Sequence, residues 1–543
     1  MAPTPPEPPA EPTTPIRRGR WWASPAAFAA LLLASVGVSL SFWPGHMDPD
    51  TLDELTEGIH NSYTNWHAPI LSAMYRVGWL LGLGNPGWVL LAGVLTLAVG
   101  FYLVLRVRLS RPWAACVAIL CMLFPPVLAW EIQVGVDAWF AGFALCGFGL
   151  AARAWRTRGW SRWISLVGAL VFAFLVLATR PTGLPVVLIL CCALAFLALG
   201  RVRRWRLTIV IATGVVASVA LLGSQMAIDS LLRTADLHPD EVVYVYDLAM
   251  MSREEGRVLL PADIDPAQNL AQIVDASNTD SIDGLLFGSG SFIRVPLSGP
   301  QYTTLRAAWI TAILHDPGAY LHERAAITLR LIMVTGPPLW VTQWPQFNPG
   351  YSALLPTVNT GAMNYLLAFT QGRDNALGGI IFTGWAYLIL LLAEAIWLLR
   401  RRNPAERVLG LLAAALLLYT AAVCIGSPGV VYRYVYPAVT GATVLSALIL
   451  AMAISSGVSR FRARGVGAAA SATGSPPPPP LPPPLSPSSP PPPPPPQPPS
   501  PPPPPPPPQL LSPPPAPPPS QLLSPPPPPP PPPLPPPPPP PRG

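Results

Sequence analysis

The chain has 543 residues, of which 51% are hydrophobic and only 11% charged. About a quarter of the residues in a soluble globular chain are charged. This composition, with apolar runs of membrane length, therefore excludes a soluble enzyme. The net charge of +7 comes from arginine, because no lysine occurs among the 33 basic residues. Most of the 79 prolines follow residue 475, so the sequence predicts a membrane body followed by a proline-rich tail.

The predicted fold class is an all-α membrane protein with about ten transmembrane helices, an outer-face loop region and disordered Pro-rich termini. A helix needs about 20 apolar residues to cross a bilayer. In chain order, the segments with this pattern are 25–43, 87–105, 112–130, 138–152, 163–179, 183–200, 207–226, 377–399, 408–425 and 434–455. Segments 69–84 and 325–340 are apolar but interrupted, so we expect an interfacial helix at the first and an interfacial or re-entrant segment at the second.

Arginine occurs in every second loop of this arrangement. The Arg-rich segments are 17–20, 106–111, 153–162, 201–206, 400–407 and 460–464. Cytoplasmic loops of membrane proteins carry an excess of basic residues. The pattern therefore predicts a multi-pass protein of the plasma membrane with both termini in the cytoplasm. The first span is too long for a cleaved signal peptide and is expected to act as a signal anchor.

The chain is predicted to divide into five parts. They are a disordered cytoplasmic Pro/Arg N-terminus (1–20), spans 1–7 with the first outer loop 44–68 (21–226), an extracytoplasmic loop region (227–376), spans 8–10 (377–455) and a disordered cytoplasmic Pro-rich tail (456–543). The loop region is too long for a simple connector. We therefore expect a small extramembrane domain there, with amphipathic helices near 303–335.

The loops opposite the Arg-rich ones hold most of the residues suited to chemistry. Charged residues at the edge of a membrane are costly and tend to mark function. We predict that Asp50, Asp137, Arg180 and Arg433 converge on this outer surface, an arrangement that suits an anionic ligand beside a general base. The alternative is that such charges are solvated loop residues, and it applies most to a second set, Asp48, Asp53 and Glu57.

Several short motifs on this side follow one another in a recognisable order. The motifs are Trp43-Pro44-Gly45 leading to Asp50-Thr51, Asn65-Trp66-His67-Ala68-Pro69, Val136-Asp137, Arg180-Pro181-Thr182-Gly183, Tyr246-Asp247-Leu248-Ala249 with Leu260-Pro261, His315-Asp316-Pro317 with Tyr320, and Arg433-Tyr434-Val435-Tyr436-Pro437. Over roughly residues 20–455 the chain resembles bacterial members of the GT-C superfamily of polytopic glycosyltransferases. Examples of that superfamily are the protein O-mannosyltransferases and the aminoarabinose transferases of lipid A. Related sequences often have Lys where Val136 stands here.

The resemblance implies transfer of a sugar from a polyprenyl-phosphate carrier to a lipid, glycan or protein acceptor on the outer face of the membrane. It implies that Asp50 is the catalytic base. Arginine binds phosphate through paired N–H donors, so Arg180 and Arg433 are the candidates for the donor phosphate. The other predicted substrate-binding residues are Trp66, His67, Asp137 and Tyr432.

No cofactor is predicted for this reaction. The Asp48-Pro49-Asp50 sequence invites a divalent metal, but no third ligand is evident, so a metal site is left open and not assigned. The sequence contains no Walker or dinucleotide fingerprint, which argues against direct use of ATP or a nucleotide sugar. Besides donor and acceptor, the expected partners are membrane lipids, and no nucleic acid is expected.

Two other functions compete with the transferase. One is a transporter or flippase of an amphipathic lipid, which should carry broken or polar helices near the bilayer midplane and internal repeats. The other is a membrane scaffold that acts through the proline-rich tail. From Pro476 that tail is predicted to form a polyproline II rod, which could bind aromatic-lined grooves or serve as a spacer. A low-complexity repeat without a specific partner is the simpler interpretation.

Overall fold

The structure, a computed structural model, describes residues 25–83, 86–199, 206–232, 234–277, 280–287, 291–335, 360–370 and 381–472. These residues form an all-α membrane protein, as predicted, and no β-strand occurs among them. They belong to one compact unit that ends at Ala472. The predictions for the N-terminus 1–20, for residues 336–340 and for the tail beyond residue 472 lie outside the described residues.

Seven stretches of described helix are long and apolar enough to cross a membrane. They are α4 (Gly87–Leu105), α7 (Val136–Arg156), α8 (Trp160–Thr179), η1 (Pro181–Gly183) continued by α9 (Leu184–Leu199), α10 (Arg206–Leu231), α19 (Pro404–Gly426) and the first part of α20 (Tyr436–Ala472). Each coincides with a predicted span. Helix α20 continues past the predicted end of the last span at residue 455, so the start of the predicted disordered tail is helical.

The three other predicted spans take different forms. Helices α1 (Pro25–Ser41) and α18 (Gly384–Leu399) are apolar but shorter. The predicted span 112–130 is two helices, α5 (Arg111–Leu123) and α6 (Pro125–Glu131), with a bend of 72° between them. Pro125 and Pro126 explain the break, because proline lacks the N–H that would continue the α5 ladder and its ring clashes with the preceding turn.

Helix α7 packs against several of the other long helices. It contacts α4, α8, α9, α19 and α20, and most of its residues are buried. Small residues permit the close approach of α4, because a Cβ added at Gly149 would lie only 2.6 Å from the Cβ of Leu103. Helices in membranes gain from such close backbone contact, since lipid removes the hydrophobic drive for association. The helices that carry the candidate site are therefore tightly packed against one another.

Three of the Arg-rich loops, all among the described residues, lie together at one end of these helices. Nη1 of Arg156 donates to the carbonyl oxygens of Arg106 at 2.9 Å and Val107 at 2.6 Å. Arg108 forms an ion pair with the buried carboxylate of Glu406 at the start of α19. Loops 106–111, 153–162 and 400–407 thus share one side of the bundle, as the alternation of Arg along the sequence requires.

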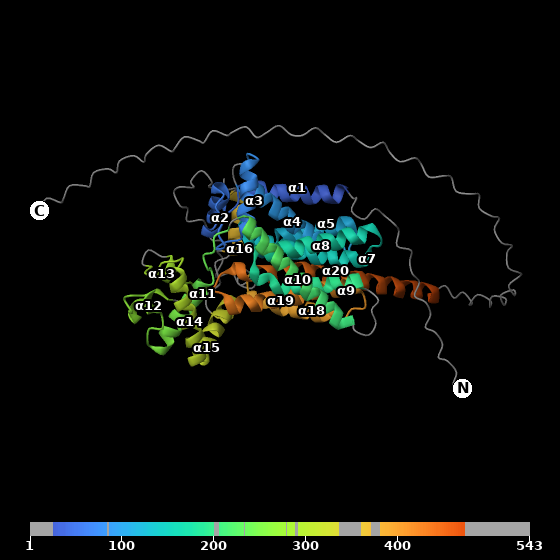
Figure 1. The fold of residues 1–543 in the computed structure, drawn as a ribbon. Helices are drawn as coiled ribbons and strands as arrows, with labels where there is room; N and C mark the ends of the chain where they lie inside the picture. Colours follow the sequence, from blue (N-terminus) through green and yellow to red (C-terminus); the bar gives the residue numbers. More distant parts are fainter. Residues whose placement is uncertain are drawn as a thin grey trace, which may run out of the picture. The chain divides into compact units, whose positions relative to one another are not determined.

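Shorter helices lie at the opposite end. They are α2 (Pro49–His60), α3 (Pro69–Leu80), α11 (Glu241–Glu255), α12 (Leu270–Ala276), α13 (Asp283–Leu286), α14 (Gly299–His315), α15 (Pro317–Leu331), α16 (Thr360–Thr370) and η3 (Tyr432–Tyr434). Helix α3 covers the predicted interfacial segment, and α14 and α15 cover the region where amphipathic helices were predicted. We call residues 234–335 the α11–α15 segment, and Figure 1 shows its helices grouped together.

The bundle end with the Arg-rich loops yields a stability prediction. The Glu406 side chain is fully buried and is contacted by Arg108 and by Nε of Arg401 at 3.0 Å, while both arginines are partly exposed. Glu406→Gln removes the negative charge that both arginines face and should cost about 1–2 kcal/mol of stability. We expect a lower Tm for this variant in detergent. Arg402→Gln, in the same exposed loop, is the matched control, and equal Tm values for both variants would contradict the assignment.

Candidate active site

Asp48 and Pro49 fix the start of α2. The Asp48 carboxylate accepts hydrogen bonds from the Thr51 backbone N–H at 2.8 Å and from its hydroxyl at 2.7 Å, which makes Asp48 the N-cap of the helix. Proline is well suited to the next position, because the first helical residue needs no N–H donor. Asp50 follows in the first turn, and its side chain is 45% exposed. The local sequence therefore presents one carboxylate to solvent.

Arg433 joins this loop to the other end of the chain. Its Nη1 donates to Oδ2 of Asp50 at 2.5 Å and to Oδ2 of Asp48 at 3.2 Å. Arg433 lies in η3, the short helix between α19 and α20, and most of its side chain is shielded from solvent. A single guanidinium thus holds two carboxylates that precede it by nearly 400 residues.

Arg180 and Asp137 form a second ion pair. Nη2 of Arg180 donates to Oδ2 of Asp137 at 2.6 Å, and its Nε lies 2.6 Å from Oδ1. Asp137 is in the first turn of α7, and Arg180 directly follows α8. Two-point contact between guanidinium and carboxylate fixes the orientation of both groups. The pair therefore marks where α7 and α8 meet at this end of the bundle.

Tyr434 connects the two ion pairs. The guanidinium carbon of Arg180 lies 5.5 Å from the centre of the Tyr434 ring, and that of Arg433 lies 5.4 Å from it. A cation within about 6 Å of an aromatic ring face is attracted by the ring. The structure thus brings together Asp50, Asp137, Arg180 and Arg433. With Asp48 and Tyr434 we call these residues the Asp–Arg cluster.

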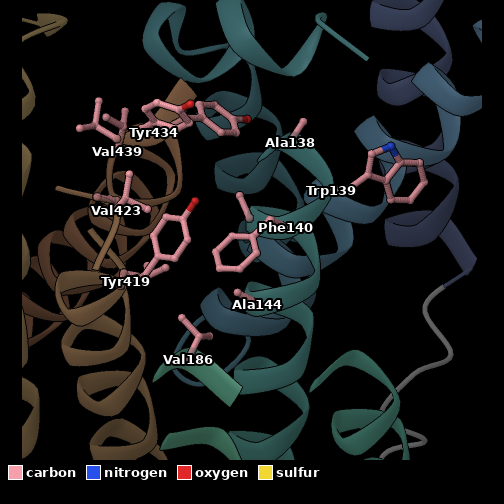
Figure 2. Close-up of a cluster of buried hydrophobic side chains, with 14 of the residues drawn as sticks. Ala138, Trp139, Phe140, Ala144, Val186, Tyr419, Val423, Tyr434 and Val439 are labelled. Atoms are coloured by element: carbon pink, nitrogen blue, oxygen red, sulfur yellow. The ribbon is translucent and has the colours of Figure 1, made fainter. Parts of the chain in front are cut away.

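Apolar side chains underlie the Asp–Arg cluster. The rings of Phe140 on α7 and Tyr419 on α19 are stacked with their centres 4.4 Å apart, and neither is exposed. Figure 2 shows both rings together with Tyr434 among buried aliphatic side chains. Charges interact more strongly beside such a surface than in water, because the local dielectric is lower. The charges of the cluster therefore influence one another, and a bound ion, more strongly than they would in water.

The two carboxyls on Arg433 differ in acidity. Burial disfavours the charged form of each. At Asp50 the positive charges of Arg433, His67 and Arg180 outweigh burial and hold the pKa below its usual value. At Asp48 burial and the neighbouring charge of Asp50 prevail, so its pKa is raised. Asp50 is therefore the carboxylate that stays charged and reaches solvent.

Glu54 is a buried carboxyl that the sequence analysis did not single out. It lies one turn after Asp50 on α2 and is 2% exposed. Its Oε2 has no hydrogen-bond partner in the described part of the chain. Burial, with the charges of Asp48, Asp50 and Glu57, raises its pKa well above the usual value. The spacing of four residues from Asp50 is the signal that places it on the same helix face.

Of the two predicted residues Trp66 and His67, only His67 interacts with the Asp–Arg cluster, through the charge of Asp50. Nε2 of the buried His67 lies 3.5 Å from Oδ2 of the exposed Asp53. Burial lowers the pKa of His67, but the carboxylates of Asp53, Asp50 and Glu57 outweigh it and the pKa is raised overall. Trp66 is half-buried and packs against the hydrophobic core. His67 therefore acts on Asp50 through its charge.

Tyr432, another predicted substrate-binding residue, lies in the core and not in the Asp–Arg cluster. Its side chain is fully buried, its hydroxyl donates to the carbonyl of Pro126 at 3.3 Å, and its ring meets Phe382 edge to face. Positions 432 and 434 of a 3₁₀ helix do not share a face, because such a helix has about three residues per turn. Tyr434 therefore meets the arginines, and Tyr432 packs into the core.

The description of this loop as solvated is wrong for two of its carboxylates. Asp48 and Glu57 are both buried. Glu57 accepts hydrogen bonds from the hydroxyls of Thr64 at 2.5 Å and Ser72 at 2.7 Å, which ties α2 to the end of the loop and to α3. Asp53 is 71% exposed. Glu57 thus holds the loop that positions Asp50.

The Asp–Arg cluster holds a guanidinium between Asp48 and Asp50, where the sequence left a metal open. In the described ranges, the group whose ligand atoms could hold a metal ion is Glu254, His322 and Glu323, on α11 and α15.

Comparisons with known proteins give a distant likeness of fold. No protein-family model matches the chain, and no curated protein sequence matches it. Solved structures of the archaeal oligosaccharyltransferase AglB from Archaeoglobus fulgidus are similar. One, with an inhibitory peptide and a dolichol-phosphate, has 15% identity and a TM-score of 0.37 over 81% of this chain and 51% of that chain. Another, with Zn and sulfate, has 16% identity and a TM-score of 0.37 over 79% and 49%. This chain spans about half the length of that enzyme, and the likeness concerns the fold alone.

His46 makes folding sensitive to acid. It pairs with the end of α6, where its backbone N–H donates to the Ile132 carbonyl at 2.8 Å and its carbonyl accepts from Val134 at 3.0 Å. Burial lowers the pKa of its imidazole from 6.5 to about 4. Below pH 6.5 the unfolded chain takes up a proton that the folded protein refuses, so stability falls by about 1.4 kcal/mol per pH unit until the folded pKa is reached.

We therefore expect His46→Gln to flatten the loss of stability between pH 6.5 and pH 4. Thermal unfolding in detergent across this range measures the slope. His60→Gln, at the exposed end of α2, is the matched control and should leave the slope unchanged. An unaltered acid slope in His46→Gln would contradict the prediction.

Proposed function

We propose that this protein is an integral membrane glycosyltransferase of the GT-C type. It moves a sugar from a polyprenyl-phosphate carrier to a cell-envelope acceptor on the outer face of the plasma membrane, with both termini in the cytoplasm. The observation that carries the proposal is the Asp–Arg cluster. A partly exposed carboxylate, Asp50, is in contact with Arg433, and Arg180 lies across the Tyr434 ring, all at the end opposite the Arg-rich loops.

The arginines suit the phosphate of the donor. Guanidinium groups bind phosphate oxygens through paired N–H donors and stay charged at every physiological pH. The Arg180 side chain is fixed by Asp137 and keeps part of its surface exposed. Arg433 is shared between two carboxylates and can turn one of its N–H groups to a phosphate while Asp48 retains it. Both would stabilise the charge that develops on the leaving phosphate.

Asp50 is the base in this mechanism. The acceptor hydroxyl oxygen attacks the anomeric carbon, the bond from that carbon to the phosphate oxygen breaks, and the phosphate leaves as an anion. The hydroxyl proton passes to Asp50. While Arg433 holds Asp50, the carboxylate is a weak base. Transfer of Arg433 to the donor phosphate strengthens the base at the moment when the donor is present.

The competing functions fit the geometry less well. The broken span of α5 and α6 is a feature that a transporter would also show. A transporter is, however, expected to bind its substrate near the bilayer midplane, whereas Asp50, Asp137 and Arg180 all lie at helix ends. A scaffold that acts through the tail gives the ion pairs of the Asp–Arg cluster no part in its function.

Paired changes distinguish the transferase from the scaffold. Asp50→Asn removes the base and should reduce transfer by about a hundredfold to ten-thousandfold. Deletion of residues 476–543 should leave transfer within about twofold of the intact chain. Both are scored on cell-envelope glycans in a host strain that lacks the gene. The reverse pattern, with loss on deletion and none in Asp50→Asn, would overturn the proposal.

Arg433→Gln tests the coupling between donor phosphate and base. Loss of a preorganised charge at the leaving group should lower kcat by about a hundredfold or more. Because Arg433 holds the pKa of Asp50 down, its loss should also move the acidic limb of the kcat/KM profile to higher pH. Arg402→Gln, an exposed arginine at the Arg-rich end of the bundle, is the control. A lower kcat without any change in the pH profile would show that Arg433 does not tune Asp50.

A further inference from the structure

Five aromatic rings form a continuous row on the α11–α15 segment. His238 stacks on Tyr302 with ring centres 4.1 Å apart, Tyr302 lies 6.2 Å from Tyr244, and Tyr244 lies 4.6 Å from Trp309. Trp309 then meets Tyr320 edge to face at 6.5 Å. The rings come from α11, α14, α15 and the residues before α11. We call this row the aromatic ladder.

The rings of the ladder are half-buried, so each keeps surface for a ligand. Hydrogen bonds hold three of them in place. The hydroxyls of Tyr244 and Tyr302 both donate to Oδ2 of Asp240, at 2.6 Å and 2.7 Å, and Nε1 of Trp309 donates to Asp247 at 2.8 Å. A preorganised aromatic surface costs little side-chain entropy when it binds. The ladder is thus built as a rigid platform.

The first outer loop is clamped to the start of the ladder. Asn65 N–H donates to the Ala235 carbonyl at 2.9 Å, and Ala235 N–H donates to the Tyr63 carbonyl at 2.9 Å. The Asn65 side chain adds bonds to Asp236 and to the Leu237 N–H, both at 2.7 Å. Since His238 is the next residue and Trp66 follows Asn65, the ladder begins where the loop that carries Asp50 ends.

The last outer loop is fastened to the same segment. Nη1 of Arg324 donates to the Ser427 carbonyl at 2.6 Å, and Val430 N–H donates to the Asp280 carbonyl at 2.8 Å. This loop leads directly to Arg433. The ladder therefore belongs to a segment that contacts both loops of the Asp–Arg cluster, although it supplies no residue to the cluster.

The charges beside the ladder select a class of ligand. Asp236 and Asp240 are exposed at its His238 end. The exposed Arg306 acts on Tyr302 through its charge, and Arg324, 5.8 Å from the centre of the Tyr320 ring, is paired with Asp247. The two exposed carboxylates thus outnumber the one arginine without an acidic partner among the described residues there, which disfavours an anionic ligand. Carboxylate oxygens also accept hydrogen bonds from sugar hydroxyls. The faces of aromatic rings carry partial negative charge and attract the C–H face of a sugar ring. A neutral saccharide fits both features.

We propose that the aromatic ladder binds a neutral saccharide chain, the acceptor of the reaction. The acceptor role rests on the proposed function. Saccharide binding itself does not, because it is measured without any transfer. The saccharide lies along the ladder, and one of its ends extends past His238 toward the loop with Trp66 and Asp50.

The test uses the purified full-length protein in detergent with tetrasaccharides of mannose, glucose and galactose. Saturation-transfer NMR detects contact between aromatic protons and the sugar, and titration gives Kd. Tyr302→Leu removes a ring, and Tyr302→Phe keeps the ring but loses the hydroxyl. Leu should raise Kd about tenfold, and Phe should change it less than threefold. Trp160→Leu, an exposed ring at the Arg-rich end, is the matched control and should bind like the unaltered protein.

Further arms separate the outcomes. Asp50→Asn should bind the saccharide with an unchanged Kd but should not transfer sugar to it. Failure of the proposed transfer reaction and failure of saccharide binding by the ladder therefore give different results. The uronic acid tetrasaccharide should bind more weakly than its neutral counterpart. Absence of binding to every neutral tetrasaccharide, equal Kd values for Tyr302→Leu and Tyr302→Phe, or binding of a random peptide pool in place of the sugars would overturn the proposal.

Discussion

The contact of Arg433 with Asp48 and Asp50 is the interaction on which the site depends. Asp48 caps α2 and Arg433 lies between α19 and α20, so this one side chain ties the beginning of the membrane body to its end. Removal of charges from water is costly, and a pair that is partly buried persists only where hydrogen bonds compensate that cost. Here Thr51, Tyr434 and the second pair of Arg180 with Asp137 surround it.

The sequence was sufficient for the membrane class and for the order of the helices. Apolar length located α4, α7, α8 and α19, because a bilayer imposes one helix length on every span. The alternation of Arg placed Asp50, Asp137, Arg180 and Arg433 on one side, and the structure brings them together. The Arg alternation thus predicted that these residues lie at the same end of the bundle. It could not predict which of them form ion pairs, because that depends on side-chain orientation.

Other features depend on three-dimensional context. The break at Pro125–Pro126 was visible as two prolines, yet hydropathy alone predicted one span over 112–130. Tyr432 and Tyr434 are two residues apart, and only the 3₁₀ geometry decides which of them meets the arginines. In the sequence Glu54 is one of several acids in a polar stretch, and it is buried in a structure where α2 packs against α3. The aromatic ladder combines rings from three helices, so no local sequence motif predicts it.

The two fastenings of the α11–α15 segment have a mechanical consequence. Asn65 secures one loop to it, and Arg324 secures the other. The segment is therefore hydrogen-bonded both to the loop that follows Asp50 and to the loop that precedes Arg433. A shift of this segment would displace both loops, and the distance between the guanidinium and its carboxylates would change with them.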